Sequence, residues 1–138
     1  DFVDTDVCIQ ACEGRRLQDI IDNEGPQAFC RLEERHILSL DRRRSVIATG
    51  GSVVYSEPAM RHLAAYGLIV HLDLPLPLIE QRLTNFGTRG VVIHAGQSLR
   101  DLYDERQPLY HRWADLTVDA RDMNHEEVLA ALLYALNI

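Results

Sequence analysis

The sequence predicts an α/β fold in which a mostly parallel sheet is covered by helices on both faces. Three observations support this prediction. Short runs of β-branched and apolar residues alternate with longer segments whose apolar residues recur at helical spacing. The short runs lack the polar–apolar alternation of a half-exposed strand, so both faces of the sheet are expected to be covered. Strands that alternate with helices along a chain favour parallel pairing.

The expected strands are residues 1–4, 45–49, 68–73 and 116–119. The second of them reads Ser-Val-Ile-Ala-Thr and ends at the pair Gly50-Gly51. Its β-branched residues favour an extended backbone, and its glycines mark the turn that follows. The other three runs have the same apolar, β-branched character.

Helical spacing predicts helices over residues 27–42, 57–66, 75–86, 98–113 and 124–136. Gly67 is a stop signal for the second, prolines occupy the first turn of the third, and Ser98 and Asn124 are good N-cap residues for the last two. Pro108 lies inside the fourth, where we expect it to kink or restart the helix and so to aim Arg106.

Bulk composition excludes some classes of partner. The chain has 138 residues, which suits a single domain, and its net charge of −7 argues against non-specific binding to nucleic acid or to an anionic membrane. It holds no apolar run near the roughly 20 residues that span a bilayer, and no signal peptide is expected. The odd count of three cysteines favours reduced thiols and a cytoplasmic location. We expect a monomer, with a dimer as the alternative.

Candidate site residues follow the predicted strands. Ligands in open parallel sheets bind beyond the carboxyl ends of the strands. Asp4 and Asp6 follow the first strand. Two carboxylates at this spacing can reach Mg²⁺ through water and accept a hydroxyl proton, or else they cap a helix or face solvent. Gly50, Gly51 and Ser52 allow a ligand to approach the backbone closely, or else form an ordinary strand-to-helix turn.

Two further segments carry arginines that suit anions. Residues 87–97 form a glycine-punctuated connection containing Arg89 and His94, which suits a lid that closes over phosphates; the alternative is a surface connection. Arg106 precedes Pro108, and its guanidinium suits a carboxylate or phosphate; the alternative is a surface arginine paired with nearby acids.

Taken together, these segments resemble the shikimate kinase family. The resemblance runs in order along nearly the whole chain. It comprises Asp4-Thr5-Asp6, Gly25 with Phe29 and Glu33-Glu34, residues 46–51, Leu72-Asp73, Arg82-Leu83, Arg89, Arg106 with Pro108-Leu109-Tyr110, and Val118-Asp119.

The resemblance implies a three-layer fold of the P-loop nucleoside-monophosphate-kinase type, as one domain over residues 1–138. Its substrate-binding region would span residues 7–43 and its lid residues 86–98. It implies ATP-dependent phosphoryl transfer to a hydroxyl of shikimate, a step of aromatic amino-acid biosynthesis, with ATP and Mg²⁺ as cofactors. The alternatives are a kinase of the same fold for another small hydroxy-acid and a non-catalytic domain that senses a ligand.

The resemblance also implies roles for individual residues. Asp6 would bind the substrate hydroxyls as base or orienter, and Asp4 would reach Mg²⁺ through water. Arg89 would neutralise the transferring phosphate and contact the nucleotide. The segment Gly50-Gly51-Ser52 would touch the substrate, and Arg106 would clamp its carboxylate. Such roles fit phosphoryl transfer, which depends on positioning and charge neutralisation.

The sequence departs from the family's pattern at its beginning. The family's phosphate loop, strand–GxxxxGK[ST]–helix, precedes the position of Asp1 and does not occur in this sequence. We therefore expect the first, central strand to be missing and two buried strands to lose their shared neighbour. We expect the sequence to be an excerpt, or the missing segment to be disordered or removed, and we do not expect the chain alone to turn over ATP as the family does.

Other departures fall in the site. Cys30 occupies a slot that is normally arginine, and the adjacent Arg31 is turned by about 100° along a helix. Ser52 replaces the family's third glycine, and Gly90 replaces a proline after the lid arginine. The family's arginine beside the adenine aligns with Met123, which leaves nearby Arg121 as the cofactor-binding candidate.

Overall fold

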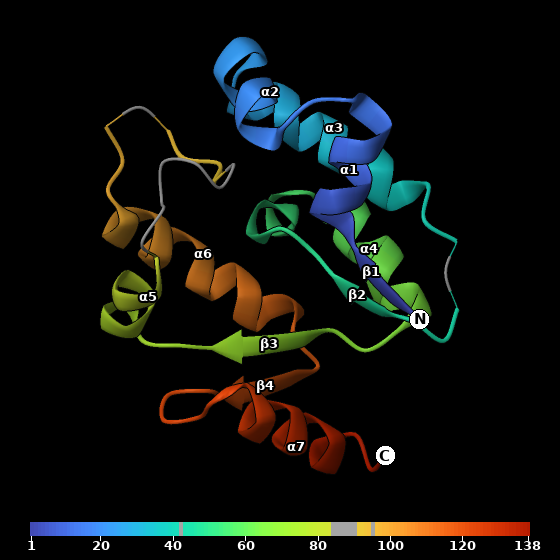
Figure 1. The fold of residues 1–138 in the computed structure, drawn as a ribbon, viewed down its shortest axis with the longest axis vertical. Coiled ribbons are helices and arrows are strands. Elements are labelled where there is room, and N and C mark those ends of the chain that lie inside the picture. Colours follow the sequence, from blue (N-terminus) through green and yellow to red (C-terminus); the bar gives the residue numbers. More distant parts are fainter. Residues whose placement is uncertain (42, 84–90, 95) are drawn as a thin grey trace.

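The computed structural model describes residues 1–41, 43–83, 91–94 and 96–138 (Figure 1). All four predicted strands are present, the first three with shorter bounds and the fourth as predicted: β1 Phe2–Asp4, β2 Val46–Ala48, β3 Val70–Asp73 and β4 Leu116–Asp119. They form two parallel pairs, β1 with β2 and β3 with β4. Parallel pairing is confirmed, but the described strands form two two-stranded sheets instead of one continuous sheet.

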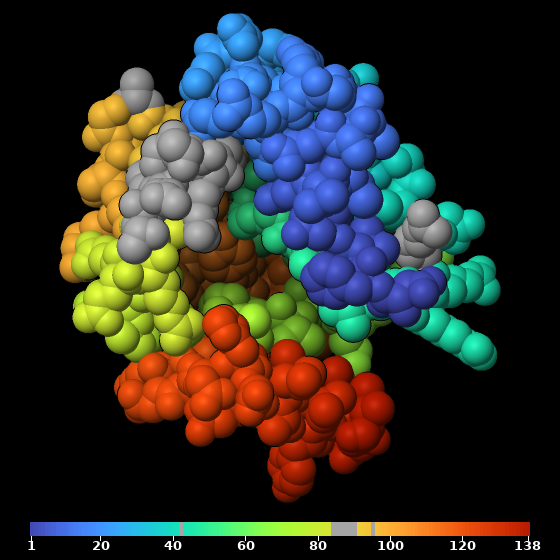
Figure 2. Space-filling view, viewed as in Figure 1, coloured from blue at the N-terminus to red at the C-terminus, as the bar shows by residue number. Residues whose placement is uncertain are grey.

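A cavity separates the two sheets. Within the described part of the chain β2 and β3 do not pair, and a cavity of about 710 Å³, lined in part by Ile47, Val70 and Tyr110, lies between them. Figure 2 shows the hollow between the N-terminal elements in blue and the C-terminal elements in red.

The helices surround these two sheets. Their bounds are α1 Thr5–Glu13, α2 Leu17–Glu24, α3 Pro26–Leu38, α4 Glu57–Tyr66, α5 Leu76–Arg82, α6 Leu99–Trp113 and α7 His125–Ala135, with a 3-10 helix η1 at Gly51–Tyr55. The five predicted helices correspond to α3 to α7. The predictions extended α3 to residue 42 and α5 to residue 86, whereas α3 ends at Leu38 and α5 at Arg82.

Helices α1 and α2 were not predicted from the sequence. Gly14 ends α1 in the left-handed conformation, with a φ of 64°, and Gly25 separates α2 from α3 with a φ of 84°. Such values favour glycine, so both residues were readable stop signals. The apolar stripe of each short helix covers too few turns to stand out by periodicity alone.

Of the two outcomes expected at Pro108, a kink or a restart of the helix, the restart is wrong. Helix α6 continues through Pro108 to Trp113 without restarting. The proline lacks the N–H that would bond the carbonyl of Asp104, but the flanking turns keep their own bonds. Arg106 is therefore placed by its hydrogen bonds, which are described below, and no restart of the helix is needed to aim it.

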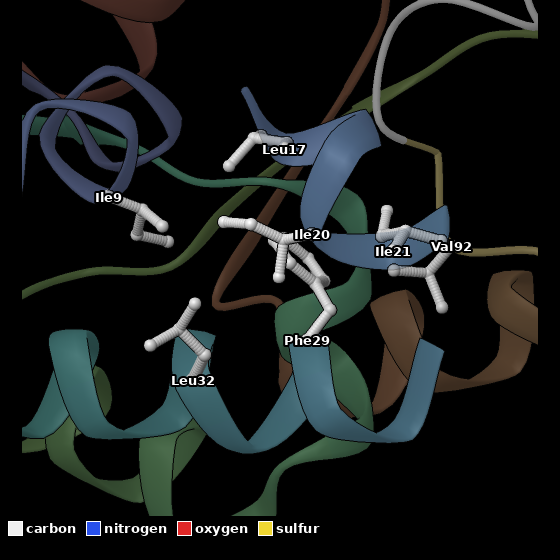
Figure 3. Packing of buried hydrophobic residues seen from close by; sticks show 7 residues of the cluster. All are labelled: Ile9, Leu17, Ile20, Ile21, Phe29, Leu32 and Val92. Atoms are coloured by element: carbon white, nitrogen blue, oxygen red, sulfur yellow. The ribbon is translucent and has the colours of Figure 1, made fainter. Parts of the chain in front are cut away.

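Helix α3 joins two apolar clusters. Its Phe29 and Leu32 pack with residues of α1 and α2 and with Val92, as Figure 3 shows. Its Ile37 packs with η1 and α4 in a second cluster. The segment between Leu32 and Ile37 therefore lies between two packed regions, and it is there that the candidate site begins.

Across the ranges that the structure describes, no helix is long and apolar enough to cross a membrane.

Candidate functional site

The parallel register of β1 and β2 brings Asp6 beside Gly50. Asp4 pairs with Ala48, so both strands end at the same edge. The chain then continues into α1 on one side and into the Gly50-Gly51 turn on the other. A Cβ placed on Gly50 would lie 2.9 Å from Oδ1 of Asp6, so only glycine leaves room there for that carboxylate. Burial, and then the charge of Asp4, raise the pKa of Asp6.

Glu33 of α3 also lies close to Gly50. Its side chain is only 1% exposed, and its Oε1 would also lie 2.9 Å from a Cβ on Gly50. The hydroxyl of Ser52 donates to its Oε2 at 2.7 Å. Burial raises the pKa of Glu33 to about 7, and the charge of Asp6 acts in the same direction, while the Ser52 bond and Arg106 oppose it. Neither Oε1 of Glu33 nor Oδ1 of Asp6 has a hydrogen-bond partner among the residues described.

Glu33 belongs to a segment that resembles the family, but no role was predicted for it from the sequence. The available signal was its position in α3, where an acid lies among the apolar residues Phe29, Leu32 and Ile37. An acidic side chain on the apolar face of a helix is either buried with a hydrogen-bond partner or exposed because the helix does not pack there.

Arg106 of α6 supplies a buried positive charge next to the glycine pair. It is 7% exposed, donates from Nη2 to the Val92 carbonyl at 2.8 Å and from Nε to the Tyr55 hydroxyl at 3.1 Å. Its Nη1 lies 3.0 Å from where a Cβ on Gly51 would be. No described carboxylate lies within ion-pair distance of it. A buried guanidinium without an acid is costly, so the arrangement favours an anionic ligand.

Tyr110 fixes the glycine turn against α6. Its hydroxyl donates to the carbonyl of Gly51 at 3.0 Å. The aromatic ring and the Arg106 guanidinium both arise from α6, one helical turn apart. The Tyr110 bond holds the Gly51 backbone close to the Arg106 guanidinium. One ligand could therefore contact both the backbone of Gly51 and the guanidinium.

Asp4 shows the capping geometry that sequence analysis kept as an alternative. Its Oδ1 accepts hydrogen bonds from the backbone N–H groups of Asp6 at 2.9 Å and Val7 at 3.1 Å. The second oxygen, Oδ2, is outside this cap. No group of three metal-ligating side chains occurs in the described ranges. The residues present therefore fit a largely hydrated Mg²⁺ reached through one carboxylate, and they do not form an all-protein cage.

Cys30 lies half-buried beside this site. It lines a cavity of about 330 Å³ together with Arg31, His94 and two contacts of Arg106, Tyr55 and Val92. Burial, and then the charge of Glu33, raise the pKa of its thiol. Arg31 is exposed on the rim of this cavity and makes no ion pair with any described acid.

The structure thus brings together five of the predicted site residues, namely Asp6, Gly50, Gly51, Ser52 and Arg106, with Cys30 beside them. It does not bring Arg121 to them: that side chain is exposed after β4 and pairs with Asp119 at 3.3 Å. Arg89 lies outside the described residues. Of the predicted lid, Val92 is buried in the first apolar cluster, so this part of the segment is more than a surface connection.

Carboxylates at the ends of parallel strands, with a buried arginine beside them, lie where open α/β sheets bind their ligands. A family sequence model described as "Shikimate kinase" matches residues 1–137. The chain belongs to the shikimate kinase family, whose members are phosphotransferases with an alcohol group as acceptor.

Relatives in sequence support this membership. The chain is 30% identical over 138 residues to shikimate kinase from Caldanaerobacter subterraneus subsp. tengcongensis, covering 98% of this chain and 80% of the relative. It is 32% identical over 136 residues to shikimate kinase from Thermodesulfovibrio yellowstonii, covering 96% and 78%.

Solved structures agree with the fold. The structure of shikimate kinase from Acinetobacter baumannii in complex with shikimate matches with a TM-score of 0.84 at 29% identity, over 99% of this chain and 79% of that one. Shikimate kinase from Aquifex aeolicus matches with a TM-score of 0.81 at 27% identity, over 99% and 80%. These matches confirm the α/β kinase fold that the sequence predicted.

Proposed function

We propose that this protein catalyses ATP-dependent phosphoryl transfer to a hydroxyl of shikimate. The observation that carries the proposal is the buried guanidinium of Arg106, which no described acid neutralises and which lies beside the Gly51 backbone. A small acid that also bears hydroxyls would complete this arrangement. Its carboxylate would meet Arg106 and its hydroxyls would meet the carboxyl groups near Gly50.

In this proposal each residue has a distinct task. Arg106 binds the acceptor carboxylate and so sets its orientation. Gly51 provides backbone that the acceptor can approach closely. Asp6 holds the reacting hydroxyl and accepts its proton, and a raised pKa favours that acceptance. Ser52 holds Glu33 in place through its hydroxyl.

ATP would supply the phosphoryl group, with Mg²⁺ offsetting the charge on its phosphates. On the protein side we assign the contact with hydrated Mg²⁺ to Oδ2 of Asp4 and neutralisation of the transferring group to Arg89. We assign residues 7–43 to acceptor binding and residues 86–98 to a lid. The odd count of cysteines, none of them in a disulfide, supports a cytoplasmic location.

A second candidate is phosphorylation of a different small hydroxy-acid. The half-buried Cys30 favours it, because this thiol lies beside the Arg106 site and supplies no positive charge. The adjoining cavity of about 330 Å³ would hold an acceptor with an additional uncharged group.

The two candidates are separated by calorimetric titration of the protein with shikimate and with a panel of hydroxylated carboxylic acids, followed by an ATP-dependent phosphorylation assay with each ligand that binds. We expect shikimate to bind, and to stimulate ATP consumption when the assayed protein includes a phosphate loop. The Arg106→Met variant should lose binding, because the site then has no cation for the carboxylate. Tight binding and turnover of another acid, with no response to shikimate, would replace the first candidate by the second.

A further inference from the structure

The hydroxyl of Tyr55 lies between the buried guanidinium of Arg106 and the carboxylate of Glu105. It accepts a hydrogen bond from Nε of Arg106 at 3.1 Å and donates its own proton to Oε1 of Glu105. The guanidinium carbon of Arg106 also lies 5.2 Å from the centre of the Tyr55 ring. A guanidinium can only donate and an ionised carboxylate can only accept, so the direction of both bonds is fixed by the chemistry of the partners.

Tyr55 shares one edge of the guanidinium with Val92. Nε and Nη2 lie on the same edge of this planar group, and they donate to the Tyr55 hydroxyl and, at 2.8 Å, to the Val92 carbonyl. These two oxygens take the places that the oxygens of a carboxylate would occupy in a bidentate pair. The Nη1 end of the guanidinium lies next to Gly51 instead. The edge held by Tyr55 and Val92 is therefore closed to a ligand, and the Nη1 end faces the glycine turn.

Glu105 is itself held by the segment that precedes α6. Its second oxygen, Oε2, accepts from Nε2 of Gln97 at 2.8 Å, and Oε1 of Gln97 accepts from the backbone N–H of His94 at 3.1 Å. A hydroxyl that donates to a carboxylate becomes a better acceptor, because hydrogen bonds in a chain polarise one another. The chain from Gln97 through Glu105 to Tyr55 therefore orients and strengthens the bond to Arg106.

The depth of each group explains why the link runs through a hydroxyl. Arg106 is 7% exposed, whereas Glu105 is an exposed residue. A direct ion pair would require the carboxylate to be buried as well, and its loss of hydration would be costly. Burial, and then the bond to Glu105, raise the pKa of Tyr55, while Arg106 opposes them. The phenol therefore keeps its proton at neutral pH and donates it outward to Glu105.

We propose that Tyr55 is a positioning residue of the acceptor site: its hydroxyl, oriented by Glu105, holds one edge of the Arg106 guanidinium and so presents the Nη1 end to the acceptor. Glu105 acts on the site only through this hydroxyl. The role in acceptor binding rests on the function proposed above, whereas the bond between Tyr55 and Arg106 can be measured without any ligand.

The first test follows the Nε–H signals of ¹⁵N-labelled arginine by NMR without a ligand. The signal of Arg106 is identified by its absence in Arg106→Lys. We expect its proton to exchange with water about tenfold faster in Tyr55→Phe, which keeps the ring and removes the acceptor. The matched control is Tyr134→Phe, since Tyr134 is 87% exposed, and it should leave the exchange rate unchanged. An equal rate in Tyr55→Phe and the unmodified protein would overturn the proposal.

The second test asks whether Glu105 acts through Tyr55. Glu105→Gln removes the charge at nearly constant size, and we expect the Arg106 Nε–H to exchange faster than in the unmodified protein. The double variant with Tyr55→Phe should match Tyr55→Phe alone, because no hydroxyl remains to pass on the effect. Asp104→Asn removes a charge at a neighbouring exposed position of α6 and should have no effect. Independent effects that add in the double variant would refute the link.

The third test measures shikimate affinity by calorimetric titration of the same variants. We expect an about tenfold loss in Tyr55→Phe, no further loss in the double variant and normal affinity in Tyr134→Phe. Normal affinity in Tyr55→Phe, with faster Arg106 exchange, would refute the positioning role while leaving shikimate binding intact. If no variant and not even the unmodified protein binds shikimate, the proposed function fails, and the positioning role for that acceptor fails with it; the NMR measurements then still decide whether Tyr55 holds Arg106.

Discussion

Arg106 lies so close to Gly51 that a Cβ on Gly51 would be 3.0 Å from Nη1 of Arg106 and 2.7 Å from the hydroxyl of Tyr110. The backbone at position 51 has no positive φ, so the glycine is required by space and not by conformation. The missing side chain leaves room for a guanidinium and a hydroxyl to meet the same stretch of backbone.

Gly51→Ala should therefore weaken ligand binding. The methyl group would force the Tyr110 hydroxyl to move, break its bond to the Gly51 carbonyl and push Arg106 from its place. We expect shikimate affinity to fall by about tenfold, or roughly 1.4 kcal/mol, in a calorimetric titration. Gly67→Ala is the matched control, because its Cβ would meet open space, and it should bind normally. Equal affinity in both variants would show that the contact has no role in binding.

Arg106→Lys tests whether the shape of the guanidinium matters beyond its charge. An ammonium keeps the positive charge but cannot bond to Val92 and Tyr55 while it also forks around a carboxylate. We expect a loss of roughly 1.5–3 kcal/mol in shikimate binding. The loss should disappear for an analogue whose carboxylate is converted to an amide. Arg100→Lys, an exposed change on the same helix, serves as the control. If Arg106→Lys weakens binding of the amide analogue as much as binding of shikimate, Arg106 contacts a part of the ligand other than its carboxylate.

The pH dependence of folding stability should report Glu33. Its pKa is about 7 in the folded protein and 4.5 in the unfolded chain, so the folded state binds more protons between these values. The stabilisation is complete below about pH 4.5 and is lost as pH rises through about 7, which amounts to about 3 kcal/mol. Urea unfolding at a series of pH values should show this decline in the unmodified protein and not in Glu33→Gln. If the free energy of unfolding changes with pH in the same way in both proteins, the pKa of Glu33 is not raised by folding.

Cys30→Arg should strengthen the site. A guanidinium at this position would lie near Glu33 and beside the Arg106 site, where the structure provides a cavity of about 330 Å³. We expect shikimate to bind at least tenfold more tightly, because a charge-assisted hydrogen bond contributes roughly 1.5–3 kcal/mol. The pKa of Glu33, followed by NMR of its carboxyl carbon, should also fall, since a nearby cation favours the carboxylate.

The control for this change is Cys12→Arg, which adds the same charge at an exposed position of α1. It should alter neither the affinity for shikimate nor the titration of Glu33. If Cys30→Arg also changes neither the affinity for shikimate nor the titration of Glu33, the side chain at position 30 does not face the acceptor.

Local patterns were sufficient for part of the fold and part of the site. The four strands were found because β-branched runs and glycine stops are properties of neighbouring residues. The proximity of Asp6 and Gly50 was expected because parallel strands end at one edge. The short helices α1 and α2 were not assigned, and the restart of α6 at Pro108 was wrong, because tertiary packing supports a helix that local signals would interrupt.

The sequence by itself determined the family, the order of the four strands and of helices α3 to α7, and the set of polar residues at the strand ends, since these depend on residue type and spacing. Only the tertiary structure decided that Glu33 is buried against Ser52 and that Arg106 is held by Val92 and Tyr55. Each of these contacts joins segments that are far apart in the chain. Burial and charge at such contacts depend on how helices pack, and no local pattern encodes that packing.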